Sequence, residues 1–193
     1  MKLNSRRTIL TGLAFLSICA FWQMYDNVIP LILTKTFHMN ETLSGAIMAA
    51  DNILALFLLP FFGARSDKTN TKIGKRMPYI LFGTGCAVLL MNLLPLIDNS
   101  YAAAPSSFKT VSFVIVLGLL LIAMGTYRSP AVALMPDLTP KPLRSRANAI
   151  INLMGAVGGM IYLGIAAVLY SQKRLSAMGL TKADRLDYQP LFL

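Results

Sequence analysis

A charged connector lies at the centre of the sequence pattern and runs Gly63-Ala64-Arg65-Ser66-Asp67-Lys68-Thr69-Asn70-Thr71-Lys72-Ile73-Gly74-Lys75-Arg76. The stretches around it are almost uncharged: residues 42–64 hold one charged side chain, Asp51, and residues 77–97 hold none. Each stretch reaches the roughly 20 apolar residues that cross the hydrocarbon core of a bilayer as a helix. The pattern therefore predicts two membrane-spanning helices joined by a short polar loop.

Three further charge-poor stretches extend this pattern outward along the chain. Residues 8–34 contain only Asp26, residues 110–136 contain only Arg128, and residues 147–172 contain no charge. The 193 residues are 55% hydrophobic and 13% charged, whereas a soluble domain is about a quarter charged. We therefore predict an all-α integral membrane protein with five transmembrane helices, and exclude a soluble globular domain.

The basic residues indicate the orientation. With a cytoplasmic N-terminus, the inside segments hold eleven Lys and Arg residues, including Lys2, while the two short outside loops hold only Lys35 and Lys109. This bias is the positive-inside pattern, so most of the net charge of +10 is a topology signal. We expect a multi-pass protein of the cell (plasma) membrane. Nucleic-acid binding is not expected, because the basic residues lack the aromatic interleaving of a nucleic-acid groove.

Three charges fall inside the predicted spans, where a charge is costly and usually serves a function or a partner. Aromatic rings stack on sugar C–H surfaces, and sugar hydroxyls need paired donors and acceptors. A buried carboxylate is also suited to carry a coupling proton, because burial favours its neutral form. The candidate solute and cation site comprises Trp22, Tyr25, Asp26, Asp51, Asn52 and Arg128.

Two other interpretations of these residues stay open. In the first, the three charges simply neutralise one another inside the bundle. In the second, Trp22 and Tyr25 belong to the aromatic belt at a membrane interface, to which they are equally suited.

The stretch 147–172 carries a packing pattern. Small and polar residues recur every three or four positions: Asn148, Asn152, Gly155, Gly159 and Tyr162. Residues at this spacing share one helix face, and Gly155-x-x-x-Gly159 allows a second helix to approach closely. We expect this face to form a helix–helix seam.

The connector also resembles a known family signature. Gly63-x-x-x-Asp67-Lys68 followed by Gly74-Lys75-Arg76 is similar to the loop between the second and third helices of the major facilitator superfamily. A second segment, Pro130-x-x-Ala-Leu-x-x-Asp137-Leu138, is followed by Arg146-Ala-Asn-Ala and resembles the same branch. This branch contains the sucrose carriers and the glycoside-pentoside-hexuronide:cation symporters.

The resemblance implies a fold of twelve helices in two bundles that alternate access to a central site, coupled to a proton or sodium ion, with no other cofactor and no metal. It also implies a cytoplasmic charge network that locks the outward-open state, in which Asp67 pairs with Arg76, and Asp137 pairs with Arg144 or Arg146. Gly63, Lys68, Gly74 and Lys75 complete that motif. The plant carriers have arginine where this chain has Val132, so a sugar-binding role for Arg128 follows from its chemistry and not from alignment.

Residues 173–193 look like an external loop leading into another apolar helix. They carry Lys173, Arg174, Lys182 and Arg185 and close on Leu191-Phe192-Leu193. We expect the chain to be an N-terminal fragment with five of six helices of the first bundle, which needs a missing C-terminal bundle as partner.

Other functions fit the sequence less well. No HExxH, Gly-x-Ser-x-Gly or Gly-x-Gly-x-x-Gly motif occurs, and such motifs would be expected for the corresponding enzymes, so we expect no enzyme. A superfamily transporter of a non-sugar solute and a structural or regulatory membrane subunit remain as alternatives.

Overall fold

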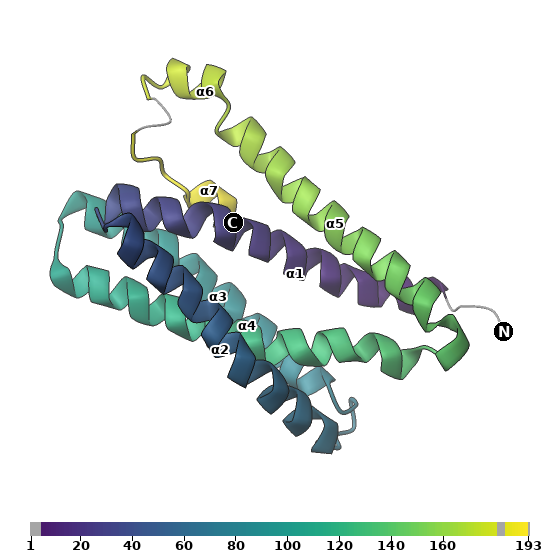
Figure 1. The fold of residues 1–193 in the computed structure, drawn as a ribbon. Helices are drawn as coiled ribbons and strands as arrows, with labels where there is room; N and C mark the ends of the chain where they lie inside the picture. The colour runs from purple at the N-terminus through teal and green to yellow at the C-terminus, as the bar shows by residue number, and fades with distance from the viewer. Residues whose placement is uncertain (1–4, 181–183, 193) are drawn as a thin grey trace.

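Helices form nearly all the regular structure in residues 5–180 and 184–192, the part of the chain that the computed structural model describes (Figure 1). Within these residues there is no β-strand, which confirms the predicted all-α fold. In this described part, five helices are long and apolar enough to cross a membrane. Two of the basic residues, Lys2 and Lys182, lie outside the described residues.

The elements follow one another in the order α1 (Ser5–Leu31), a π-helical turn η1 (Ile32–Thr36), α2 (Glu41–Lys68), α3 (Met77–Ala103), α4 (Ser107–Leu138), a 3₁₀ turn η2 (Lys141–Leu143), α5 (Arg144–Leu169), α6 (Gln172–Ala177) and α7 (Gln189–Phe192).

The helix ends differ from the limits of the charge-poor stretches. Helix α2 continues to Lys68, and α4 extends at both ends, because polar residues can stay helical at a membrane surface, where the helix satisfies their backbone groups. Helix α5 begins at Arg144 and ends at Leu169, about one turn earlier than the stretch 147–172. The single turn α7 lies where the sequence suggests the start of another helix.

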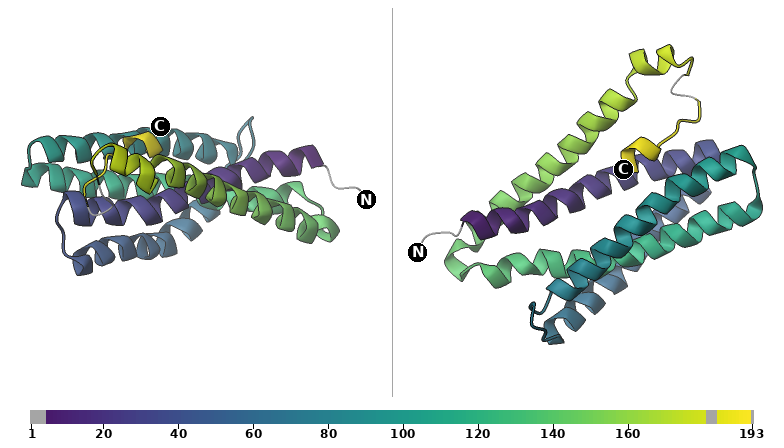
Figure 2. Two further views of the ribbon diagram at one scale, coloured as in Figure 1. Left: turned by 90° about the horizontal axis from the view of Figure 1, so that it is seen from above. Right: turned by 180° about the vertical axis from the view of Figure 1, so that it is seen from behind.

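Two helix pairs and a fifth helix, α2, make up the bundle. Helices α1 and α5 pack together, α3 and α4 pack together, and α2 packs on α4 (Figure 1). Helix α1 also contacts α4 and so joins the pairs. Beyond the contact with α1, helix α5 diverges, and the short helix α7 packs on α3 (Figures 1 and 2). The fully buried large side chains include Tyr25 and Ile29 of α1 and Phe113 and Leu120 of α4, so the core lies where these two helices meet.

Glycines on α5 allow the close approach to α1. A Cβ atom added at Gly155 would lie 2.9 Å from Cys19 Sγ, and one at Gly159 would lie 3.1 Å from Gln23 Cγ. At Gly158 a Cβ would overlap the backbone carbonyl of Leu16. Dispersion contacts between close backbones are a main source of helix association in lipid, so this seam stabilises the α1–α5 pair.

Two of the five residues predicted for the seam do not lie on the contact face of α5. Gly155, Gly159 and Tyr162 are buried as expected, but Asn148 and Asn152 are exposed. Ala147 and Ile151 are buried in their place. Each residue turns a helix by about 100°, so a shift of one position moves a side chain off the contact face.

We expect Gly158→Ala to lower the free energy of unfolding by about 1–3 kcal/mol, because the added methyl group meets the Leu16 backbone, which cannot move aside cheaply. Gly164→Ala is the matched control, since a Cβ there has no atom within 4 Å; it should be neutral or stabilising by up to about 1 kcal/mol. Reversible unfolding of the purified chain in detergent micelles measures both. Equal effects would contradict the seam.

Candidate functional site

Helices α1, α2 and α4 bring three candidate residues to one small pocket. Trp22 of α1, Asp51 of α2 and Arg128 of α4 line it, together with apolar side chains and Gly125. Its volume is about 10 Å³, no more than the space that one water molecule needs. The three side chains therefore meet in a closed arrangement that has no room for a solute.

Arg128 covers the ring of Trp22. Its guanidinium carbon lies 4.8 Å from the ring centroid, within the range of a cation–π interaction. The Trp22 ring also meets the Tyr25 ring edge to face at 5.3 Å, and Tyr25 is fully buried. The indole face that would stack on a sugar is thus occupied by a cationic group.

Polar atoms around this pocket have unused hydrogen-bonding capacity. Among the described residues, the buried atoms Trp22 Nε1, Tyr25 Oη and Asp51 Oδ1 have no hydrogen-bond partner. No ion pair joins Asp51 to Arg128 in the same part of the chain, so these two side chains do not neutralise each other by direct contact. Buried polar groups without partners are costly, and their gathering at one place marks a site able to accept a polar ligand.

Three of the six candidates do not line this pocket: Tyr25, which packs against the Trp22 ring, and Asp26 and Asn52. The side chains of Asp26 and Asn52 are exposed and do not line it. Each follows a pocket or core residue by one position, Tyr25 and Asp51 respectively, and the helix rotation carries it to another face. Gly125 was not singled out from the sequence; a Cβ there would lie 3.1 Å from Leu58 Cβ, so this glycine lets α2 approach α4 beside the pocket.

A second polar cluster joins α2, α3 and α4 at one end of the bundle, here called the Arg76 end. Arg76 Nη2 lies 2.8 Å from Asp67 Oδ1, and Arg76 Nε lies 2.6 Å from Asp137 Oδ2. Arg76 Nη1 donates to Ser66 Oγ at 3.2 Å. The arginine side chain is only 10% exposed, whereas those of Asp67 and Asp137 are 61% and 49% exposed. One buried guanidinium therefore bridges two acids from different helices.

The expected partner of Asp137 was wrong. Asp137 pairs with Arg76, while Arg144 donates to the backbone carbonyl oxygens of Pro136 at 2.9 Å and Thr139 at 3.2 Å. These carbonyls belong to the end of α4, where backbone acceptors lack partners within the helix. Arg146 is exposed.

The other motif residues shape the connector. A Cβ at Gly63 would lie 2.9 Å from Ser129 Oγ, so this glycine brings α2 close to α4. Gly74 has a φ of +106°, a backbone region that favours glycine. Lys68 and Lys75 are exposed. Ser66, fully buried against Arg76, escaped the sequence analysis because a serine at a helix end has many roles.

The chain is similar to known transporters. A family model described as Major Facilitator Superfamily matches residues 11–178. A sucrose transport protein of Arabidopsis thaliana, SUC3, is 32% identical over 141 residues, covering 66% of this chain and 23% of that protein. The sucrose transport protein SUT3 of Oryza sativa subsp. japonica is 27% identical over 170 residues, covering 79% of this chain and 33% of that protein.

A bacterial protein also matches. The putative transporter YdfJ of Escherichia coli (strain K12) is 37% identical over 92 residues, covering 45% of this chain and 20% of that protein. All three of these relatives are named as transporters and none as an enzyme. The chain spans about a quarter to a third of the length of the sucrose transport proteins it matches. No solved structure matches it.

We expect Arg76→Lys to destabilise the chain by about 1–3 kcal/mol, since a single ammonium group cannot reach Asp67, Asp137 and Ser66 together as the guanidinium fork does. The neighbouring exposed residue supplies the control: Lys75→Gln should change stability by less than about 0.5 kcal/mol. Thermal unfolding in detergent reports both. If Arg76→Lys behaves like the control, the bridge contributes nothing to the fold.

Proposed function

The chain belongs to the Major Facilitator Superfamily, and from that premise we propose that it forms part of a secondary transporter for a sugar or glycoside, coupled to a proton or a sodium ion. The observation that carries the proposal is the meeting of Trp22, Asp51 and Arg128 inside three membrane-spanning helices. Sucrose transport proteins among its relatives support the choice of solute class.

Solute binding in this proposal requires Arg128 to leave the Trp22 ring. The guanidinium occupies the indole face in the closed pocket. When Arg128 swings away, the ring becomes free to stack on the apolar face of a sugar, and the guanidinium becomes free to donate to sugar hydroxyls. The unpartnered atoms Trp22 Nε1 and Asp51 Oδ1 then supply a further donor and a further acceptor.

Asp51 is the proposed carrier of the coupling ion. Its carboxylate lies in a membrane-spanning helix and lines the pocket beside Arg128. A carboxylate among apolar side chains is readily neutralised by a proton or a cation. Binding of that ion and binding of the solute are then linked through the position of Arg128, because the guanidinium responds to the charge on Asp51.

The Arg76 cluster is the proposed gate. It ties together the adjoining ends of α2, α3 and α4, and we propose that this tie holds the cytoplasmic side closed while the opposite side is open. Alternating access needs two bundles around a shared site, so the working transporter includes a second bundle, in the same polypeptide or as a separate chain. Its place in this proposal is the plasma membrane, with the N-terminus in the cytoplasm.

The competing proposal is transport of a non-sugar solute, because the name of the bacterial relative specifies no solute. The pocket favours a solute with one apolar face and several hydroxyl groups, as Trp22, Asp51 and Arg128 together offer a ring, an acceptor and a donor. A structural or regulatory subunit would have no need of such a convergence.

Proteoliposomes made with the complete native polypeptide test the function. We expect labelled sucrose to accumulate when a proton or sodium gradient is imposed, and Asp51→Asn to abolish gradient-driven accumulation while sucrose binding persists, because the amide cannot take up a coupling ion. Lys173→Gln, an exposed change outside the pocket and the connector motif, is the control. If sucrose accumulates without either gradient, and to the same extent with Asp51→Asn as with Asp51, this residue has no coupling role.

Binding can be followed in the chain itself through Trp22, its single tryptophan. We expect sucrose to shift the intrinsic tryptophan emission of the chain in lipid nanodiscs in a saturable way, since the solute displaces the Arg128 guanidinium from the indole. Arg128→Gln should shift the emission in the absence of solute and weaken binding by about tenfold or more, as one charged hydrogen bond is lost. An emission that responds equally to an osmolyte without hydroxyl groups would contradict binding at Trp22.

A further inference from the structure

A large groove opens at the end of the bundle opposite Arg76. Its volume is about 590 Å³, in the range of small-molecule sites and far above the 10 Å³ of the Trp22 pocket. Three separate segments line it: the turn after α1, the end of α3 and the connector before α7. The lining includes Thr36, His38, Tyr101, Ala102 and Arg185. Fourteen positions separate Trp22 from Thr36, about 20 Å along a helix axis, so this groove is distinct from the proposed transport site.

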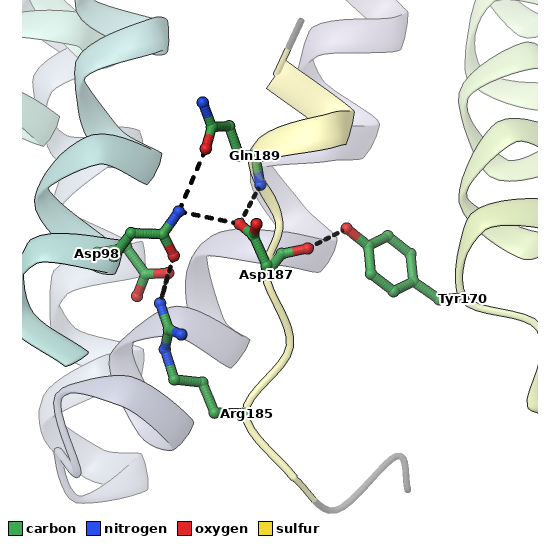
Figure 3. A network of polar contacts seen from close by, with 6 residues as sticks. Asp98, Tyr170, Arg185, Asp187 and Gln189 are labelled. Carbon is green, nitrogen blue, oxygen red and sulfur yellow. Dashed lines mark hydrogen bonds and ion pairs between the residues drawn. The ribbon is translucent and has the colours of Figure 1, made fainter. Parts of the chain in front are cut away.

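A network of polar contacts holds Arg185, one of the lining residues of the groove (Figure 3). Arg185 Nη2 donates to Asp98 Oδ2 at 2.9 Å and to Asn99 Oδ1 at 2.6 Å. Asn99 Nδ2 donates to Asp187 Oδ1 at 3.1 Å, and Tyr170 Oη donates to the backbone carbonyl of Asp187 at 2.6 Å. The connector is thereby fastened to both α3 and the end of α5, which fixes the direction of the Arg185 guanidinium.

Thr36 and Arg185 of the groove wall, and Asp98 behind them, retain unused hydrogen-bonding groups. Asp98 is 0% exposed and Thr36 is 3% exposed. Among the described residues, Asp98 Oδ1, Thr36 Oγ1 and Arg185 Nε are buried without a hydrogen-bond partner. The Thr36 hydroxyl lies within hydrogen-bonding reach of the Asp98 carboxylate, but the contact does not have the geometry of a formed hydrogen bond. An acceptor, a hydroxyl and a donor therefore gather at one place, and each would gain by binding a polar ligand.

The backbone of the groove wall is irregular in two places. Residues Ile32–Thr36 form a π-helical turn, closed by a hydrogen bond of 3.2 Å from Phe37 N to Ile32 O. His38 has a φ of +52°, a left-handed conformation that costs a residue with a Cβ about 1–2 kcal/mol. Isolated π turns and strained residues are frequent at functional sites. Here both lie in the segment that presents Thr36 to the groove.

Charge and shape narrow the class of ligand. The acids Asp98 and Asp184 balance the bases Lys35 and Arg185 around the groove, so no net charge selects an ion. Tyr101 adds an aromatic ring, and the unpartnered groups offer both donors and acceptors. These features suit a neutral molecule with many hydroxyl groups.

We propose that this groove is a second solute-binding site, which takes a neutral polyhydroxylated molecule through hydrogen bonds to Thr36 and Arg185 and through contact with the Tyr101 ring, while Asp98 holds Arg185 from behind. The site stands on its own geometry and does not depend on transport by the Trp22 pocket. In a transporter of sugars it would hold solute at the membrane surface, before entry or after release.

A fluorescent probe in the groove tests the proposal. With both native cysteines changed to alanine, Ala102→Cys, at an exposed lining position, is labelled with an environment-sensitive dye, and the full chain is placed in nanodiscs. Sucrose is the probe ligand and glycine betaine, which has no hydroxyl groups, is the osmolyte control. We expect a saturable response to sucrose and none to glycine betaine.

Two threonines two residues apart provide a matched pair of variants. Thr36→Val should weaken sucrose binding by about tenfold or more, because its unpartnered hydroxyl is lost, and Thr36→Ser should restore most of it. Thr34→Val borders the same groove, but the Thr34 hydroxyl already donates to the Pro30 carbonyl at 2.8 Å, so its effect should stay below about threefold. Thermal unfolding of each variant verifies that the fold is retained.

The proposal is overturned if the groove dye shows no saturable response to sucrose, or if Thr34→Val and Thr36→Val weaken binding equally. The same measurements distinguish a failure of this proposal from a failure of the proposed transport function. A dye response that survives Arg128→Gln, while the Trp22 signal is lost, supports the second site independently of the first. A Trp22 signal without a dye response supports the first site and rejects the second.

Discussion

Hydrocarbon offers no hydrogen bonds to a peptide group, and this constraint governs every other feature of the chain. It requires each crossing to be a continuous helix whose backbone groups pair internally. It also removes the hydrophobic effect as a force between helices, so contact must come from close packing and polar links. Both are visible here: a glycine seam joins α1 to α5, and an arginine bridge joins α2, α3 and α4.

The sites follow from the same constraint. A guanidinium inside the membrane needs a partner, and Arg128 finds the π face of Trp22 instead of a carboxylate. Asp51 keeps an oxygen without a partner among the described residues. A bundle that satisfied all these groups internally would have no capacity left for a ligand, so the incomplete pairing is itself informative about function.

The helices were predictable from the sequence because a charged residue is expensive in lipid, and long gaps between charges therefore mark the crossings. The glycines of the seam were predictable as a class, since their spacing of four repeats on one face. The rotation of each helix was not. Asp26, Asn52, Asn148 and Asn152 each lie one position from a residue that faces the interior, yet all four are exposed, and only the packing of neighbouring helices decides which face turns inward.

Pairings between distant residues were also beyond the sequence. Asp137 lies closer in sequence to Arg144 than to Arg76, but the guanidinium of Arg144 is needed at the carbonyl groups that end α4. The ion pair that holds Arg185 at the groove was missed for a similar reason: Asp98 and Arg185 are far apart along the chain, and no local pattern connects them.

The π-helical turn at Ile32–Thr36 has a consequence for how this chain tolerates change in length. A π turn arises when one residue is inserted into an α-helix and the extra residue is absorbed as a local bulge. Deleting a single residue there would restore a regular helix, shorten the first crossing by one position and rotate the residues after the deletion by about 100°. Thr36 would then turn away from Asp98. The one extra residue in the π turn therefore keeps Thr36 facing Asp98, and the outer end of the first crossing would not tolerate its loss.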